Sequence, residues 1–225
     1  MRSPVPTPRV VWGVGLNYRD HAEETGRPLP VAPTLFVKSP SSVIANGDAI
    51  VVPPHVTQPD YEGELAIVIG TRARDVSEAN ALDVVAGVTI GHDVSARDHQ
   101  YTTGQWSWSK SFDTFCPLGP EMVSLDEIDI TRGLTIETKV SGEVLQSSST
   151  SQLLFSVPYL IAWISQGCTL EPGDVILTGT PAGVGAARTP PRWLVDGDVV
   201  EITIEGIGTL TNPVVRREST PRSAT

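Results

Sequence analysis

The chain has 225 residues, enough for one substantial hydrophobic core or two small ones. Its hydrophobic fraction of 40% is ordinary for a soluble globular protein. Its net charge of −10 and its pI near 4.8 argue against nucleic acid or an anionic membrane as the main partner. No stretch approaches the roughly 20 consecutive apolar residues of a membrane-spanning helix.

The first residues and the cysteines bear on the cellular compartment. Met1–Pro4 lacks the apolar segment of a signal peptide. Cys116 and Cys168 both lie in apolar settings, without a CxxC motif or the Cys/His spacing of a metal site. We therefore expect two buried, reduced thiols in a cytoplasmic protein.

A short strand and a polar helix are expected first. Residues 10–16 are apolar and punctuated by glycine, and residues 17–26 read as a polar helical turn. His21 and Glu24 are three residues apart, so they share a helix face. A carboxylate on one imidazole nitrogen raises the basicity of the other, although a plain surface ion pair is the alternative. Together with the proline-rich residues 27–33, this segment is expected to form a mobile lid carrying an acid/base pair.

Two further strands follow. Residues 34–38 are expected to form one strand, ended by a turn at 39–42. Asn46–Gly47–Asp48 reads as a turn before a second strand at 49–52, which Pro53–Pro54 stops.

The stretch Leu65–Gly70 reads as a buried strand with Glu62 and Glu64 just before it. Because a strand has a side-chain period of two, both carboxylates project from one face, roughly 6–7 Å apart. Two like charges beside an apolar strand repel each other and are costly to desolvate, and a divalent cation reverses that cost. The alternative is a pair of solvated glutamates on an edge strand.

A third carboxylate favours the metal. Ser77 is expected to cap a short helix that ends near Val84, and residues 84–92 read as another buried strand with Asp93 at its end. Three acids at the ends of adjacent core strands indicate a metal site with three carboxylate ligands on one face.

The next segment carries a candidate cation. Residues 95–100 are polar, and residues 104–117 are rich in aromatic side chains and are expected to be rigid. Lys110 lies among these aromatic residues. Such a lysine usually extends its charge to solvent, but here it could supply a fixed cation to a carboxylate or an enolate.

A hairpin and the clearest helix come next. Residues 134–140 and 143–146 are expected to pair across a tight turn at Ser141–Gly142, with a polar loop at 147–150. Residues 156–166 are expected to be helical, with Ser156 as N-cap and Gly167 as the stop. The buried stripe of this helix is Val157, Leu160, Ile161 and Ile164.

The last third contains a glycine-rich loop. A type II turn at 171–174 leads into a strand at 175–177 and then into residues 178–185, whose backbone N–H groups could bind an anion or form an ordinary tight loop. The final hairpin joins 199–204 to 209–215, and the polar tail 216–225 is expected to be disordered. No repeat or linker divides the chain, so residues 1–215 are expected to form one domain.

Four motifs in this order resemble the fumarylacetoacetate hydrolase superfamily. They are Tyr61–Glu64, Asp93–Asp98, Lys110–Asp113 and Leu177–Pro181, and the similarity runs from about Gly15 to Val215. The resemblance implies a mostly β (α+β) fold, a mixed sandwich or roll with a few short helices, that is usually homodimeric. Many members carry an additional N-terminal domain; here the catalytic core begins almost at once, so the specificity such a domain contributes is expected to be absent.

The resemblance also implies roles for single residues. Mg²⁺ or Mn²⁺ is expected on Glu62, Glu64 and Asp93. The lid pair is expected to match His21 and Glu24, with Lys110 as the third catalytic residue. The expected substrate-binding residues are Arg97, Gln100, Gly179 and Thr180.

The family includes several chemistries, so the function is predicted as a class. The first hypothesis is a metal-dependent hydrolase that cleaves a C–C bond of a 2,4-dioxo acid and releases pyruvate, with His21 activating water. Oxaloacetate decarboxylation and isomerisation of 2-hydroxyhepta-2,4-diene-1,7-dioate in aromatic catabolism are the alternatives. A non-catalytic metal-binding protein is the alternative from another class.

Overall fold

The computed structural model describes residues 3–5 and 7–218, and its centre is a seven-stranded mixed sheet. In spatial order its strands are β2 (Thr34–Lys38), β1 (Val11–Gly15), β12 (Val175–Leu177), β6 (Gly63–Ile69), β7 (Val85–His92), β9 (Cys116–Val123) and β3 (Val43–Ala45). The β1–β12 and β3–β9 pairs are parallel and the other pairs are antiparallel.

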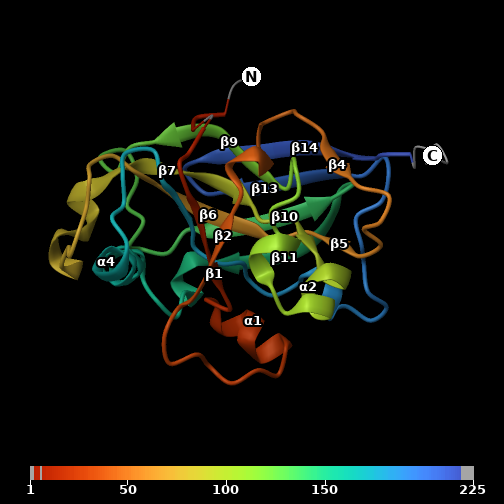
Figure 1. Ribbon diagram of the computed structural model, residues 1–225, viewed down its shortest axis with the longest axis horizontal. Coiled ribbons are helices and arrows are strands. Elements are labelled where there is room, and N and C mark those ends of the chain that lie inside the picture. The colour runs from red at the N-terminus through yellow and green to blue at the C-terminus, as the bar shows by residue number, and fades with distance from the viewer. Residues whose placement is uncertain (1–2, 6, 219–225) are drawn as a thin grey trace, which may run out of the picture.

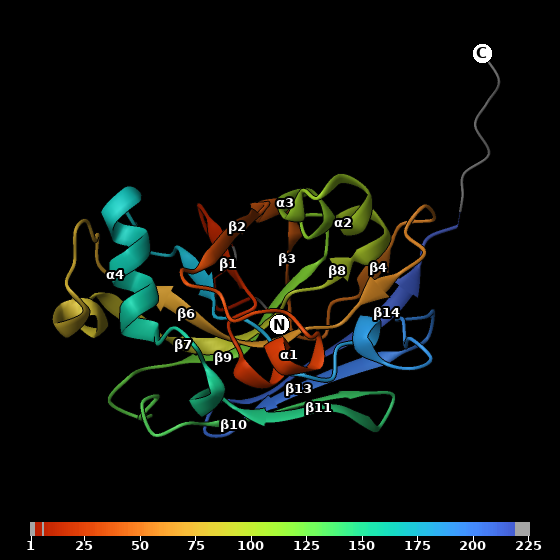
Figure 2. The same cartoon turned by 90° about the horizontal axis from the view of Figure 1, so that it is seen from below.

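A five-stranded sheet packs against the first (Figures 1 and 2). Its strands are β11 (Glu143–Ser149), β10 (Thr135–Val140), β13 (Val199–Ile204), β14 (Gly208–Arg216) and β4 (Ile50–Val52). In Figure 2 the layer of β10, β11 and β13 lies beneath β6, β7 and β9. Apolar side chains of both sheets, such as Leu65, Ile90 and Ile202, form one continuous core between the layers.

Short helices border the sheets. They are α1 (Arg19–Glu24), α2 (Arg97–Thr103), α3 (Trp106–Ser109) and α4 (Val157–Gly167), with 3₁₀ turns η1 (Pro40–Ser42), η2 (Glu78–Val84), η3 (Thr150–Gln152) and η4 (Gly185–Ala187). A two-stranded ribbon pairs β5 (Pro59–Asp60) with β8 (Ser95–Ala96). The mostly β fold class with a few short helices is confirmed.

Within residues 3–5 and 7–218, the helices are all too short or too polar to cross a bilayer.

Strand β6 is buried along its whole length, as its continuous apolar run predicts. It pairs with β12 on one side and β7 on the other, and Gly63 lies opposite His92 in that register. This register brings the start of β6 beside the end of β7, so the residues just outside both strands meet at one edge of the sheet. The close approach of β6, β7 and β12 depends on Gly91, where a Cβ would overlap Leu177.

Several local predictions are confirmed. Helix α4 begins after Ser156, whose hydroxyl accepts a hydrogen bond from the Tyr159 N–H at 3.3 Å, and its four predicted core residues are buried. The turn at 171–174 has Gly173 at φ 86°, as type II requires. Strand β2 has the predicted bounds.

Other predictions are wrong in detail. Cys116 is buried, but Cys168 is exposed because it lies at the C-terminal end of α4, beyond the buried stripe. The helix after Ser77 is a 3₁₀ helix without a side-chain cap. Strand β11 continues through the predicted loop to Ser149, since its pairing with β10 supplies backbone partners as far as Thr135.

The expected disordered tail overlaps the last strand. Arg216 belongs to β14 and pairs with Val52, and the Arg217 N–H donates to the Val52 carbonyl at 3.0 Å. Residues 219–225 lie outside the described residues.

Candidate metal centre and active site

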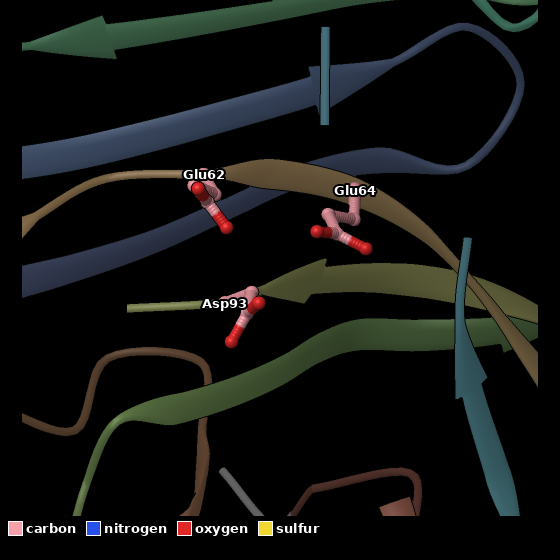
Figure 3. A group of neighbouring side chains, drawn as sticks. All are labelled: Glu62, Glu64 and Asp93. Carbon is pink, nitrogen blue, oxygen red and sulfur yellow. The ribbon is translucent and has the colours of Figure 1, made fainter. Parts of the chain in front are cut away.

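Three buried carboxylates meet where β6 begins and β7 ends. Glu62, Glu64 and Asp93 each offer an oxygen within 4.8 Å of the others, and we call these three residues the carboxylate triad. Figure 3 shows Glu62 and Glu64 on the β6 segment and Asp93 at the end of β7, all pointing into the same space. The Asp93 N–H donates to the Glu62 carbonyl at 2.9 Å, which fixes the two segments side by side. The predicted convergence of the three acids is confirmed.

Glu62 is stabilised as an anion by two cations. Its side chain accepts from Lys110 Nζ at 2.6 Å and from the Arg97 guanidinium. Burial alone would raise the pKa of Glu62, but Arg97 and Lys110 outweigh it and hold that pKa well below its ordinary range. Glu62 is therefore charged at neutral pH.

Glu64 forms no ion pair with a lysine or arginine among residues 3–5 and 7–218. Burial, followed by the negative charges of Asp93 and Glu62, raises the pKa of Glu64 well above its ordinary value. Its Oε2 accepts one backbone hydrogen bond, from the Gly179 N–H at 2.6 Å. A further negative charge on Glu64 is thus unfavourable at this buried point without a compensating cation.

The donor set fits a hard divalent cation. Carboxylate oxygens are the ligands that Mg²⁺ and Mn²⁺ prefer, and histidine and cysteine are absent from the triad. A cation among the three acids would remove the repulsion that raises the pKa of Glu64. Glu62, Glu64 and Asp93 are thus the residues that would hold it.

Two lysines contact Asp93, and of these only Lys110 was predicted as a site residue. Lys110 Nζ donates to Asp93 Oδ2 and to Ser95 Oγ, the latter at 2.9 Å. Lys38 Nζ lies 2.5 Å from Asp93 Oδ1 and also donates to the backbone carbonyl of Lys110. Lys38 ends β2, where a lysine usually reaches solvent, so only the fold reveals its burial.

Arg97 connects the triad to the glycine-rich loop. It donates to Asp60 Oδ2 at 2.8 Å and to Gln100 Oε1 at 2.9 Å, besides its contact with Glu62. Asp60 in turn accepts from the Gly185 N–H at 2.7 Å. Arg97 and Gln100 lie on the first turn of α2, so this short helix carries both to the cavity.

The predicted lid pair is formed. His21 Nδ1 lies 3.2 Å from Glu24 Oε2 on α1, and both residues face the cavity above the triad. The other oxygen of Glu24 accepts from the Gly183 N–H at 2.9 Å, and Ser148 donates to Asp20 at 2.5 Å. Helix α1 is thereby docked on the glycine-rich loop and on β11. The predicted mobility of the lid stays a prediction.

The carboxylate triad and the His21–Glu24 pair line one cavity of about 370 Å³. Its lining includes nine of the ten predicted site residues: His21, Glu24, Glu62, Glu64, Asp93, Arg97, Gln100, Lys110 and Thr180. Gly179 is not among the described lining residues, and its N–H holds Glu64 instead. Thr180 donates to the Gly63 carbonyl at 3.0 Å, next to the triad.

Further walls of the cavity were not predicted. Phe36 and Trp106 form an aromatic wall with ring centroids 5.8 Å apart, and Lys110 Nζ lies 4.8 Å from the centre of the Phe36 ring. Arg27 and Tyr101 also line the cavity. The aromatic richness of residues 104–117 was the signal for Trp106, but nothing in the sequence joined it to Phe36.

Comparison with known proteins gives consistent results. The family model described as "Fumarylacetoacetate (FAA) hydrolase C-terminal" matches residues 10–215. The mitochondrial oxaloacetate tautomerases Fahd2a of Rattus norvegicus and FAHD2A of Homo sapiens are each 47% identical, over 95% of this chain and 68% of their own length.

Solved structures agree in fold. A 5-carboxymethyl-2-hydroxymuconate delta-isomerase from Mycobacterium smegmatis is 47% identical with a TM-score of 0.87, over 97% of this chain and 83% of that one. A 2-hydroxyhepta-2,4-diene-1,7-dioate isomerase from Mycobacterium marinum is 45% identical with a TM-score of 0.86, over 96% and 78%. These names favour the isomerase alternative over the hydrolysis that was predicted first. The length and continuity of these matches show that the chain is an enzyme of the fumarylacetoacetate hydrolase family.

Proposed function

We propose that the protein is a divalent-metal-dependent tautomerase or isomerase of a 2-oxo dicarboxylic acid, with oxaloacetate as the first substrate to test. The observation that carries the proposal is that the His21–Glu24 pair faces the same cavity as the carboxylate triad. The tautomerase and isomerase names of the relatives support proton transfer over cleavage by water.

Keto–enol tautomerisation needs few parts. The C3–H bond breaks, its electron pair forms the C2–C3 double bond, and the displaced carbonyl electrons receive a proton on the C2 oxygen. No water is consumed and no carbon–carbon bond breaks. The reaction needs a base near C3, a proton donor near the oxygen, and positive charge to stabilise the enolate between the two steps.

The chain supplies the base and the proton donor. Because Nδ1 of His21 faces the Glu24 carboxylate at 3.2 Å, that nitrogen carries the proton and Nε2 is left to accept one from C3. The buried ammonium of Lys110 can donate to the C2 oxygen and adds positive charge beside it. A Mg²⁺ or Mn²⁺ ion on the carboxylate triad would supply Lewis acidity toward the developing negative charge.

The test follows the ultraviolet absorbance of enol-oxaloacetate as it converts to the keto form. With Mn²⁺, the wild-type protein should accelerate the conversion, and His21→Ala should lower kcat by about 10²–10⁴-fold. His21→Ala should keep the wild-type affinity for Mn²⁺ within a few-fold, because the side chain of His21 pairs with Glu24 and forms no hydrogen bond or ion pair with the triad in the described part of the chain. A mutant with wild-type kcat would remove His21 from the mechanism.

The same samples test the other chemistries. Pyruvate released from acetylpyruvate measures hydrolysis, and pyruvate released from oxaloacetate measures decarboxylation. If hydrolysis or decarboxylation is faster than tautomerisation, that reaction is the main activity and the proposed function is wrong. A homodimeric assembly and a cytoplasmic location stay predictions.

A further inference from the structure

The lid helix ends in a motif that determines where Arg27 begins. The Gly26 N–H donates to the Glu23 carbonyl and the Arg27 N–H donates to the Ala22 carbonyl, both at 3.1 Å. Gly26 has φ 62°. These two bonds around a left-handed glycine form a Schellman motif, which ends the helix at a fixed geometry. The backbone of Arg27 is therefore held at a defined position next to helix α1, which carries the His21–Glu24 pair.

Of the arginines and lysines that line the cavity in the described part of the chain, Arg27 is the one without an ion pair. Lys110 and Arg97 also line it, but both form ion pairs with the carboxylate triad. The side chain of Arg27 forms no hydrogen bond or ion pair with the residues that the structure describes, although Glu23 and Glu24 are its near neighbours in sequence and the net charge is −10. A guanidinium without a carboxylate partner in so acidic a chain is free to bind an anion from outside.

Besides Arg27, Arg97 and Lys110, the described lining of the cavity offers no arginine or lysine to an anionic group at the far end of a substrate. Val14, Leu16, Phe36 and Trp106 are apolar, while the phenol of Tyr101 on α2 is 61% exposed. A substrate whose 2-oxo acid end lies at Lys110 and the triad would extend past these walls. A negatively charged group on the far end of the substrate could bind Arg27, and the hydroxyl of Tyr101 could donate a second hydrogen bond to it.

We propose that Arg27 binds the distal carboxylate of the substrate and makes the enzyme selective for 2-oxo dicarboxylates over 2-oxo monocarboxylates. This inference rests on the proposed function, because that function places the 2-oxo acid end at the triad. An arginine presents two parallel N–H donors that match a carboxylate, whereas a lysine offers a point charge. Since Arg27 follows the lid helix directly, binding of the distal carboxylate also holds His21 over the substrate.

The experiment compares two stable acids of equal chain length, 2-oxoglutarate and 2-oxopentanoate, by calorimetry on the Mn²⁺-loaded protein. Arg27→Met should weaken 2-oxoglutarate binding by about tenfold or more and leave 2-oxopentanoate binding within about twofold. Arg27→Lys should fall between wild type and Arg27→Met. Arg19→Met is the matched control: it removes the same charge from an exposed residue of helix α1, which Arg27 follows, and Arg19 does not line the cavity, so neither affinity should change.

Two results would overturn the inference. One is an equal loss for both acids in Arg27→Met, which would mean that Arg27 acts on the lid and not on the distal carboxylate. The other is the same small effect in Arg27→Met and Arg19→Met, which would reduce Arg27 to a contribution to net charge. Calorimetry needs no turnover, so a wild-type protein that binds 2-oxoglutarate through Arg27 but does not tautomerise oxaloacetate would refute the proposed reaction and leave the selectivity standing.

Discussion

Lys38 and Lys110 give the two oxygens of Asp93 different neighbours. Oδ1 faces Lys38, whose side chain is fully buried and is also anchored by the carbonyls of Val94 and Lys110. Oδ2 faces Lys110, whose other partners are the side chains of Glu62 and Ser95. Lys38 is therefore the fixed counter-charge of Asp93. Lys110 lines the cavity, so it is the lysine that could exchange a carboxylate partner for a substrate oxygen.

Removing Lys38 should destabilise the protein strongly. Lys38→Met leaves Asp93 with one counter-charge and two carbonyls without a donor, and breaking a buried pair in this way costs about 3–5 kcal/mol of unfolding free energy. Urea unfolding in the presence of a chelator measures it. Arg72→Met is the control, since the Arg72–Glu171 pair is largely exposed and should contribute little. Equal unfolding midpoints for the two variants would show that Lys38 has no such role.

Asp198 makes a pH-dependent contribution to the free energy of unfolding. Burial alone would raise its pKa, but hydrogen bonds from Arg192, from the Val195 N–H and from Ser141 lower that pKa below the ordinary value of 3.8. A carboxylate with a lowered folded-state pKa stabilises the fold above its unfolded-state pKa. This stabilisation is lost as the pH falls through the folded-state pKa.

Asp198→Asn should therefore lower the unfolding free energy at pH 7 by about 1.5 kcal/mol or more, the usual scale for a hydrogen bond to a charged group. The difference from wild type should stay constant between pH 7 and pH 5 and shrink below about pH 3.8. Urea titrations across this range measure it. A difference that grows on acidification would contradict the assignment.

At the scale of elements, the glycine-rich loop organises the site through its backbone. The N–H groups of Gly179, Gly183 and Gly185 donate to Glu64, Glu24 and Asp60 respectively. The sequence left open whether this loop binds an anion or is an ordinary tight turn, and in the structure its N–H groups bind carboxylates of the chain itself. No sequence pattern could name these partners, because each lies more than a hundred residues earlier.

Gly183→Ala tests this loop. Gly183 has φ 102°, and a Cβ there would overlap the Leu145 carbonyl. The substitution should displace the loop, break the bond to Glu24, and lower both kcat and the unfolding free energy. Gly142→Ala is the matched control, because Gly142 also has a positive φ, 86°, but an added Cβ would meet nothing within 4 Å. It should cost only about 1 kcal/mol of strain and leave kcat unchanged. Equal effects of the two variants would mean that the loop contact is unimportant.

The elements that the sequence missed lack a local signal. Strand β9 contains Pro117 and Pro120, which argue against a strand, and it forms through pairing with β7 and β3. Helix α2 has no periodic apolar stripe and is held by the contacts of Arg97 and Gln100. Strand β6 was predicted from its own continuous apolar run, and helix α4 from its own periodic apolar residues and its N-cap.

At the scale of the whole molecule, the carboxylate triad exists only in the complete fold. Glu62 precedes β6, Glu64 lies within it and Asp93 follows β7, so the three carboxylates converge only when these neighbouring strands are in register. The sequence could indicate which acids would meet, since each ends an apolar run. It could not indicate the cation at Lys38 or the acidic loop contacts, which arise from chain segments that only the complete fold brings together.

A cation that binds the folded state alone must raise the unfolding free energy in proportion to the logarithm of its concentration. Mn²⁺ at 100 times its dissociation constant should add about 2.7 kcal/mol, and each further tenfold about 1.4 kcal/mol. Glu64→Gln should abolish this gain while leaving the metal-free protein at least as stable as wild type, because a neutral amide is not repelled by Asp93 and Glu62 and keeps an oxygen for the Gly179 N–H. Urea unfolding at several Mn²⁺ concentrations measures both. A Glu64→Gln variant that gains as much stability from Mn²⁺ as the wild type would show that the ion binds elsewhere, and the metal centre assigned to the triad would be wrong.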